Sequence, residues 1–167
     1  NYMKLRYSDA GDGESADDLS GVSVSLSDDG TIIAIGAHGN DDAGTSTIGD
    51  INPNHSLAHI HSGQTRIYQY ASNSWSQLGS DIDGEDAGDY SGYSVDLSDD
   101  GTIVAIGAYL NDGNGSNSGH TRIYQYANNS WTQLGSDIDG EAASDYSGIS
   151  VDLSDDGTIV AIGAYLN

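Results

Sequence analysis

An internal repeat of 56 residues limits the folds that this sequence can adopt. Residues 65–70 recur at 121–126, residues 75–85 recur with one substitution at 131–141, and residues 94–108 recur at 150–164. A looser copy occupies residues 23–37, where the offset grows to 71, so 15 extra residues lie between Ala37 and Thr65. Self-similarity of this length is typical of folds that stack one supersecondary unit several times.

Within one unit, the residue pattern predicts four strands and no helix. Apolar residues alternate with polar ones over residues 93–98, which indicates a strand with one buried face. The following Asp-Asp-Gly, residues 99–101, predicts a tight hairpin. Residues 102–108 are almost continuously apolar, as in a strand covered on both faces, and further strands are predicted at 121–126 and 131–134. We therefore expect an all-β fold.

Four antiparallel strands in about 56 residues are the form of a β-propeller blade. A β-solenoid is the competing architecture, but it uses parallel pairing, whereas the Asp-Asp-Gly hairpin makes its strands antiparallel neighbours. We expect residues 1–20 to end a preceding blade and form an acidic loop. Residues 21–91 are expected to form a first blade with a 15-residue insertion between 38 and 63, residues 92–147 a second blade, and residues 148–167 two strands of a third. Because a propeller ring needs about four blades or more, we expect an incomplete propeller segment that belongs to a longer chain or is completed by partner subunits.

The charge of the chain excludes several classes of partner. Asp and Glu number 26 against four Lys and Arg, which gives a formal net charge of −22. So few cations predict no nucleic-acid binding and no attraction to anionic membranes. No apolar run reaches the roughly 20 residues of a membrane span, so we expect no membrane insertion. Cysteine is absent, which excludes disulfides and thiolate metal sites, and the acidity favours a secreted or surface protein.

Two motifs carry a resemblance to a known family. Gly92-Tyr93-Ser94-Val95, followed by Ile-Val-Ala-Ile-Gly-Ala at 103–108, resembles the FG-GAP repeat of integrin α-subunit β-propellers, and more closely the repeats of large secreted or surface proteins of marine microbes. The resemblance implies extracellular or cell-surface placement and a role in adhesion or recognition. Family members often bind calcium between their first two strands. Here Asp96, Ser98 and Asp100 take the first, third and fifth positions of that loop, but Val104 stands at the ninth, so we expect a structural hairpin.

Strand order predicts where a binding site would lie. The connections from the fourth strand to the next blade, and from the second strand to the third, should share one face of the molecule, which we expect to be the functional face. These connections hold alternating acidic residues that predict a calcium site, with Ca²⁺ as the candidate cofactor: Asp81, Asp83 and Glu85, and again Asp137, Asp139 and Glu141. A weaker candidate is the set Asp112, Asn114 and Ser116, which lacks a terminal bidentate carboxylate. The alternative is that all are solvated acidic loops.

The insertion concentrates histidine. His55, His59 and His61 lie within seven residues, with His38 nearby. Imidazoles at this spacing can bind a transition metal, but clustered histidines in a variable loop are usually solvated, and we expect the latter here.

The sequence shows no catalytic set, because no His that recurs with the repeat could serve a Ser nucleophile: His120 aligns with Gln64. We therefore expect a non-enzymatic adhesion or recognition segment, extracellular or at the cell surface. Its partner would be a protein or a glycan, bound through the acidic loops with or without Ca²⁺. Two alternatives remain open: a structural subunit of a fibre or surface layer, completed by copies of itself, and a carbohydrate-binding module.

Overall fold

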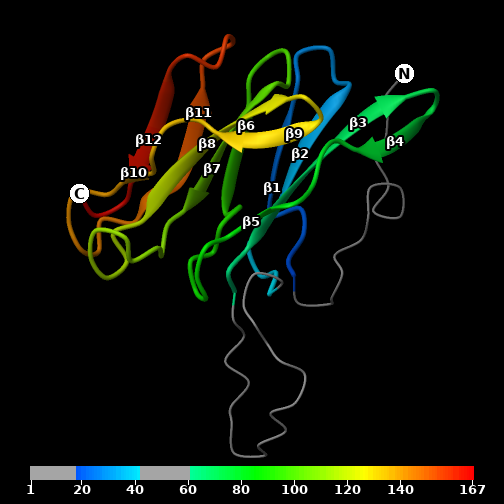
Figure 1. Ribbon diagram of the computed structural model, residues 1–167. Coiled ribbons are helices and arrows are strands. Elements are labelled where there is room, and N and C mark those ends of the chain that lie inside the picture. Colours follow the sequence, from blue (N-terminus) through cyan, green and yellow to red (C-terminus); the bar gives the residue numbers. More distant parts are fainter. Residues whose placement is uncertain (1–17, 42–60) are drawn as a thin grey trace, which may run out of the picture.

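The computed structural model describes residues 18–41 and 61–167, and every regular element among them is a β-strand (Figure 1). The strands form three antiparallel sheets that lie side by side. The first sheet contains β1 (Ser23–Leu26), β2 (Ile32–Ala37), β3 (Gln64–Ala71), β4 (Ser74–Gln77) and β5 (Ile82–Asp83). The second contains β6 (Ser94–Leu97), β7 (Ile103–Ala108), β8 (His120–Ala127), β9 (Ser130–Gln133) and β10 (Ile138–Asp139), and the third contains β11 (Ser147–Leu153) and β12 (Val160–Ala164).

The expected all-β class is confirmed, and each of the first two sheets has the strand order of a propeller blade. In the second sheet, β6, β7 and β8 are consecutive antiparallel neighbours, and β9 pairs with the far edge of β8. Strand β7 is buried along most of its length, as its continuous apolar run predicts. The strand expected before residue 18 and most of the insertion between residues 38 and 63 lie outside the described residues.

The fourth strand position differs from the expectation. In the second sheet it is occupied by two short strands, because β9 pairs with residues 124–127 of β8 and β10 pairs with residues 120–121. Strands β4 and β5 divide the same edge of β3 in the first sheet. Residues 82–83 and 138–139 were expected in loops, which is wrong. A two-residue strand is too short to produce a periodic pattern that sequence reasoning can detect.

The Asp-Asp-Gly hairpin is closed by its own side chains. Ser98 Oγ donates to the Asp100 carboxylate and accepts the backbone N–H of Ile103 at 3.0 Å. The same carboxylate accepts both the N–H and the hydroxyl of Thr102, at 2.8 and 2.7 Å. Gly101 has a φ of +68°, a conformation that glycine adopts without strain. All three bonds to Asp100 are accepted by its Oδ1, which closes the turn between β6 and β7.

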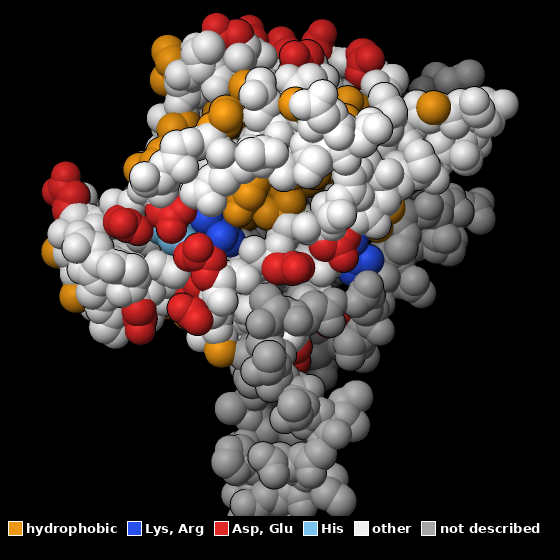
Figure 2. All heavy atoms as spheres, in the orientation of Figure 1, with side chains coloured by type: hydrophobic (Ala, Val, Ile, Leu, Met, Phe, Trp, Pro, Cys, Tyr) orange, Lys and Arg blue, Asp and Glu red, His pale blue; other side chains and the backbone are white. Residues whose placement is uncertain are grey.

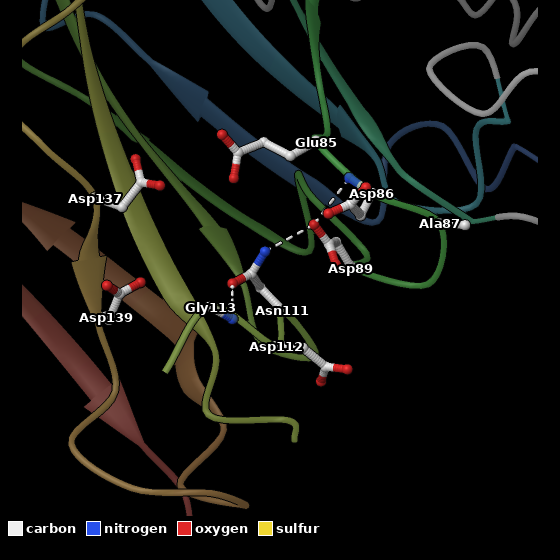
Figure 3. Close-up of a pocket in the computed structure, with 9 residues that line it drawn as sticks. All are labelled: Glu85, Asp86, Ala87, Asp89, Asn111, Asp112, Gly113, Asp137 and Asp139. Carbon is white, nitrogen blue, oxygen red and sulfur yellow. Dashed lines mark hydrogen bonds between the residues drawn. The ribbon is translucent and has the colours of Figure 1, made fainter. Parts of the chain in front are cut away.

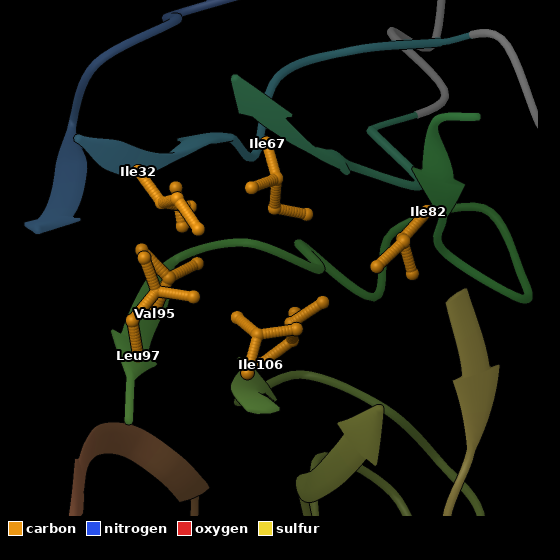
Figure 4. Packing of buried hydrophobic residues seen from close by; sticks show 8 residues of the cluster. Ile32, Ile67, Ile82, Val95, Leu97 and Ile106 are labelled. Atoms are coloured by element: carbon orange, nitrogen blue, oxygen red, sulfur yellow. The ribbon is translucent and has the colours of Figure 1, made fainter. Parts of the chain in front are cut away.

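Apolar side chains from the first two sheets form a shared core (Figure 4). Ile32, Ala34, Ile67 and Ile82 of the first sheet pack against a set from the second sheet, which is Val95, Leu97, Val104 and Ile106. Burial of such side chains stabilises each by about 1.5–3 kcal/mol relative to exposure. The sheets therefore depend on each other for their cores.

Backbone also approaches backbone closely where the sheets meet. A Cβ built on Gly107 would lie 2.0 Å from the carbonyl oxygen of Gly148 in the next sheet, and Gly36 approaches Gly92 in the same way. Ser94 Oγ donates to the Gly148 carbonyl at 2.8 Å. The glycine of the repeated Ile-Gly-Ala motif is therefore required by the contact between blades.

The described sheets do not close into a ring, so this part of the chain is an incomplete propeller (Figure 1). Val95 and Leu97 are each 6% exposed between the first and second sheets. Their repeat equivalents Val24 and Leu26, on the outer side of the first sheet, are 57% and 56% exposed. The described residues contain no helix that is long and apolar enough to cross a lipid bilayer.

Candidate functional site

The loops that the sequence placed on one face do meet there. We call residues 84–92, 109–119 and 140–146 the loop face. Asn111 Nδ2 donates to the Asp89 carboxylate at 2.8 Å, which ties the loop after β7 to the loop after β5. A pocket of about 570 Å³ opens between these two loops and residues 137–139, which border the loop face (Figure 3). It is lined by Glu85, Asp86, Ala87, Asp89, Asn111, Asp112, Gly113, Asp137 and Asp139.

Carboxylates dominate this pocket. Six of its nine lining residues are Asp or Glu, and in Figure 2 acidic side chains gather both around the loop face and along the hairpins at the top of the view. The basic group beside the pocket is Arg122, whose Nη1 lies 3.3 Å from Glu85 Oε1. Negative charges confined in a concave site raise the local concentration of cations. The pocket therefore favours a cation or a cationic group.

Asp81 and Asp83 converge on a side chain of their own sheet. Gln64 Nε2 donates to Asp81 Oδ2 and to Asp83 Oδ1, both at 3.1 Å. Gln77 also donates to Asp81. These two predicted site residues are thus brought together, but around an amide donor, and they do not line the pocket described above.

The equivalent position of the second sheet has different chemistry. Asp137 and Asp139, the equivalents of Asp81 and Asp83, both line the pocket, and His120 replaces Gln64. His120 Nδ1 lies 3.8 Å from Asp137 Oδ2, beyond hydrogen-bonding distance. Asp137 instead accepts a hydrogen bond of 2.6 Å from Gln133 Nε2.

Glu85, His120 and Asp137 form a compact group of possible metal ligands. One ligand atom from each lies within 4.8 Å of the others. In Figure 3 the carboxylates of Glu85 and Asp137 point toward one another across the pocket. Among residues 18–41 and 61–167, neither predicted acidic triplet forms a group of this kind. The structure therefore selects one member of each triplet and adds His120.

The electrostatics keep His120 uncharged near neutral pH. Burial of the ring, followed by the nearby Arg122 guanidinium, lowers the pKa of His120 below its ordinary value of 6.5, although Asp137 and Glu85 act in the opposite direction. A neutral imidazole carries one N–H and one nitrogen lone pair. His120 can therefore offer a metal ligand without first losing a proton.

Glu141 and the weaker candidate set are placed elsewhere. Glu141 is exposed, and its backbone carbonyl accepts a hydrogen bond from Asn114 Nδ2 at 3.1 Å. Asp112 Oδ1 accepts the Asn117 N–H at 2.7 Å, and the Ser116 carbonyl accepts the Ser144 N–H at 2.9 Å. The bonds of Asn114 and Ser116 hold the loop after β7 against residues 140–144. Asp112 bonds within its own loop and also lines the pocket.

Sequence reasoning missed an aromatic cluster on this side of the molecule. The ring centroids of Tyr93 and Tyr109 lie 4.4 Å apart, Tyr109 contacts Tyr90 and Tyr146, and Tyr90 stacks on His38. These residues occupy strand ends and loops, so no alternation marks them. The signal available was their recurrence, since Tyr146 repeats Tyr90.

The histidines of the insertion are only partly covered by the structure. His55 and His59 lie outside the described residues. His61 Nδ1 lies 3.1 Å from the Gly39 carbonyl and its ring contacts Tyr90, and His38 is 8% exposed. His38 and His61 therefore pack within the aromatic cluster.

Part of the chain matches a known protein family. Residues 81–124 match the model of the FG-GAP repeat family, a stretch that runs from β5 to β8 and includes Glu85 and His120. A search of curated proteins gave no match. The family match agrees with the motifs at 92–95 and 103–108. Residues 81–124 of this chain are therefore similar to an FG-GAP repeat.

Proposed function

We propose that this chain is a non-enzymatic segment of an extracellular or cell-surface propeller that recognises a protein or glycan through its loop face, with Ca²⁺ bound in the acidic pocket. The family supports the placement, because FG-GAP repeats are typical of extracellular and surface proteins. The observation that carries the proposal is the pocket itself, where six carboxylates from three chain segments meet.

Calcium fits this pocket chemically. Ca²⁺ takes six to eight oxygen ligands from carboxylates, carbonyls and water in a flexible geometry. Glu85, Asp86 and Asp89 come from the first sheet's exit loop, whereas Asp137 and Asp139 come from the second sheet. An ion held between them would link two blades and reduce the repulsion among their carboxylates. It would also leave coordination positions for an acidic or hydroxyl group of a ligand.

Calcium titration with a matched variant tests this proposal. We expect Ca²⁺ to bind the full chain in calorimetry and to raise its melting temperature, since a ligand at about 100 times its Kd stabilises by about 2.7 kcal/mol. Asp139→Asn should weaken binding, because Asp139 lines the pocket. Asp155→Asn, at the opposite hairpin end, should not. Absence of binding heat and of a thermal shift would remove calcium from the proposal.

A second candidate function is a structural subunit whose copies pack end to end. Outer residues of the first sheet, Val24 and Leu26, repeat the buried Val95 and Leu97. On the opposite end, Ile159 is 69% exposed and repeats Ile103, which packs toward the third sheet. Each end of the described segment therefore exposes one of the two surfaces that pack against each other where neighbouring sheets meet. A head-to-tail contact of this kind closes into a ring or extends as a fibre.

A further inference from the structure

The most informative side chain outside the calcium proposal is His120. It is 1% exposed, and its Nδ1 makes no hydrogen bond to any residue in the described part of the chain. Leaving a buried polar nitrogen without a partner costs about 1–3 kcal/mol. In the preceding repeat the amide nitrogen of Gln64 does have partners, since it donates to Asp81 and Asp83, although Gln64 Oε1 makes no hydrogen bond within the described residues. The second sheet thus carries a buried nitrogen that lies 3.8 Å from the Asp137 carboxylate and has no hydrogen-bond partner in the described part of the chain.

We propose that Glu85, His120 and Asp137 form a binding site for a transition-metal ion, with Zn²⁺ as the ion that fits best. Their ligand atoms lie within 4.8 Å of one another, and the three residues come from the two sheets that border the pocket. The proposal rests on the proposed function in taking the loop-face pocket as the binding site. It differs from the proposed calcium site because the ion is Zn²⁺ and one of the ligands is the imidazole nitrogen of His120.

The ligand set distinguishes zinc from calcium. Zn²⁺ binds imidazole nitrogen and carboxylate oxygen in sites of three protein ligands with a fourth position left to water or to a bound group. Ca²⁺ takes oxygen ligands, so it would gain nothing from His120. Mn²⁺ through Zn²⁺ share the preference for mixed nitrogen and oxygen sites, with affinities that rise toward Cu²⁺. The imidazole therefore makes this corner of the pocket selective for transition metals.

Arg122 does not oppose the site but positions one of its ligands. Its Nη2 donates to the Asp83 carbonyl at 2.9 Å, which fixes the guanidinium between the sheets. Its Nη1 lies 3.3 Å from Glu85 Oε1, and a carboxylate has a second oxygen available to a metal. The one positive charge of Arg122 is exceeded by the three negative charges of Glu85, Asp137 and Asp139. Arg122 thus holds Glu85, from the first sheet, near His120 of the second.

Calorimetry with Zn²⁺ and, separately, Ca²⁺ on the full chain tests the proposal. We expect one Zn²⁺ per chain at this site, and His120→Gln should weaken its binding by at least about 10- to 100-fold, the loss seen when even an indirect partner of a metal ligand is removed. His120→Gln should fold, because Gln occupies the same position in the first sheet. Its melting temperature without metal checks this. Calcium binding should be the same in both proteins.

A second pair of variants tests whether Zn²⁺ binds at this site and not at the other histidines of the chain. Glu85→Gln should weaken Zn²⁺ binding, whereas Glu141→Gln, the same substitution at the equivalent exposed position of the next repeat, should leave it unchanged. Co²⁺ absorption should report nitrogen coordination in the wild type and lose it in His120→Gln. Zinc affinity that is equal in the wild type and His120→Gln, or absent from the wild type, overturns the proposal. Calcium is titrated separately, so the two proposals can fail independently. If the protein binds Ca²⁺ but not Zn²⁺, the proposed function stands and the zinc site is wrong. If it binds Zn²⁺ but not Ca²⁺, only calcium is removed from the proposed function.

Discussion

The contact between blades makes a sharp prediction at Gly107. Its Cβ, if present, would lie 2.0 Å from the Gly148 carbonyl, and contacts under 3.0 Å essentially do not occur. The Gly107→Ala substitution therefore forces the third sheet to move by about 1 Å or more. Overpacking of a close contact costs about 1–3 kcal/mol, and the displaced carbonyl also loses its hydrogen bond from Ser94, worth about 1 kcal/mol. We expect Gly107→Ala to destabilise the protein by about 2–4 kcal/mol.

Gly163 provides the matched control, because it occupies the same repeat position in the third sheet. A Cβ there would meet the side chain of Ser150, which can rotate, and it meets no backbone closer than 3.7 Å in the described residues. Replacing glycine by alanine in a strand removes unfolded-state entropy, a gain of about 0.4–1 kcal/mol where the site has room. We expect Gly163→Ala to change the free energy of unfolding by about 1 kcal/mol or less.

Urea unfolding followed by circular dichroism measures both variants. We expect the urea concentration at the unfolding midpoint to fall strongly for Gly107→Ala and to change little for Gly163→Ala. The dependence of the free energy of unfolding on urea concentration should be the same in both variants. Equal midpoints for the two variants would refute the reasoning, because the two sites differ chiefly in the carbonyl of the next sheet.

Two further predictions concern the hairpin and the outer faces. Hydrogen bonds, first from the Thr102 N–H and then from its hydroxyl, hold the pKa of Asp100 below its ordinary value of 3.8. A carboxyl group whose pKa is lowered by folding stabilises the folded state at pH values above 3.8, and this stabilisation is lost as the pH falls through the pKa of the folded state. Asp100→Ala should therefore unfold at a lower urea concentration than the wild type near neutral pH, and this difference should become smaller in acid. A difference that grows in acid would contradict the prediction. If copies pack end to end, light scattering should give a multiple of 17.3 kDa, which Leu26→Glu on the exposed outer face reduces and Thr132→Glu on β9 does not. A wild type that stays at 17.3 kDa at high concentration would rule out the structural-subunit candidate.

The fold was predictable because its determinants are local and repeated. Alternation at 93–98, the Asp-Asp-Gly turn and the apolar run at 102–108 each specify their own segment, and repetition at 56 residues shows that the segments belong to one unit. Strands β5 and β10 could not be predicted, since two residues carry no period and their pairing depends on the edge left free by β4 and β9. Assignment of residues 1–20, 21–91, 92–147 and 148–167 to blades stays a prediction.

The candidate site was predictable in location and less so in composition. Strand order placed the acidic loops on one face, and the pocket lies there. The triplets suggested by spacing did not stay together, because Gln64 holds Asp81 and Asp83 in the first sheet while Glu85 reaches Arg122 in the second. His120 carried a signal, the replacement of Gln64 in the repeat, but its meaning depends on neighbours from another sheet.

The strands, their turns and the face that carries the charge can therefore be inferred from the sequence, because hydrophobic periodicity and turn chemistry act over a few residues. Which polar groups meet depends on how the sheets pack. Glu85 and Asp137 are 52 residues apart; Glu85 follows β5 of the first sheet and Asp137 precedes β10 of the second, so the approach of Glu85 to His120 follows from how far one sheet is rotated and shifted against the next. That geometry is set by backbone contacts such as Gly36 with Gly92, and side-chain spacing along the chain does not encode it.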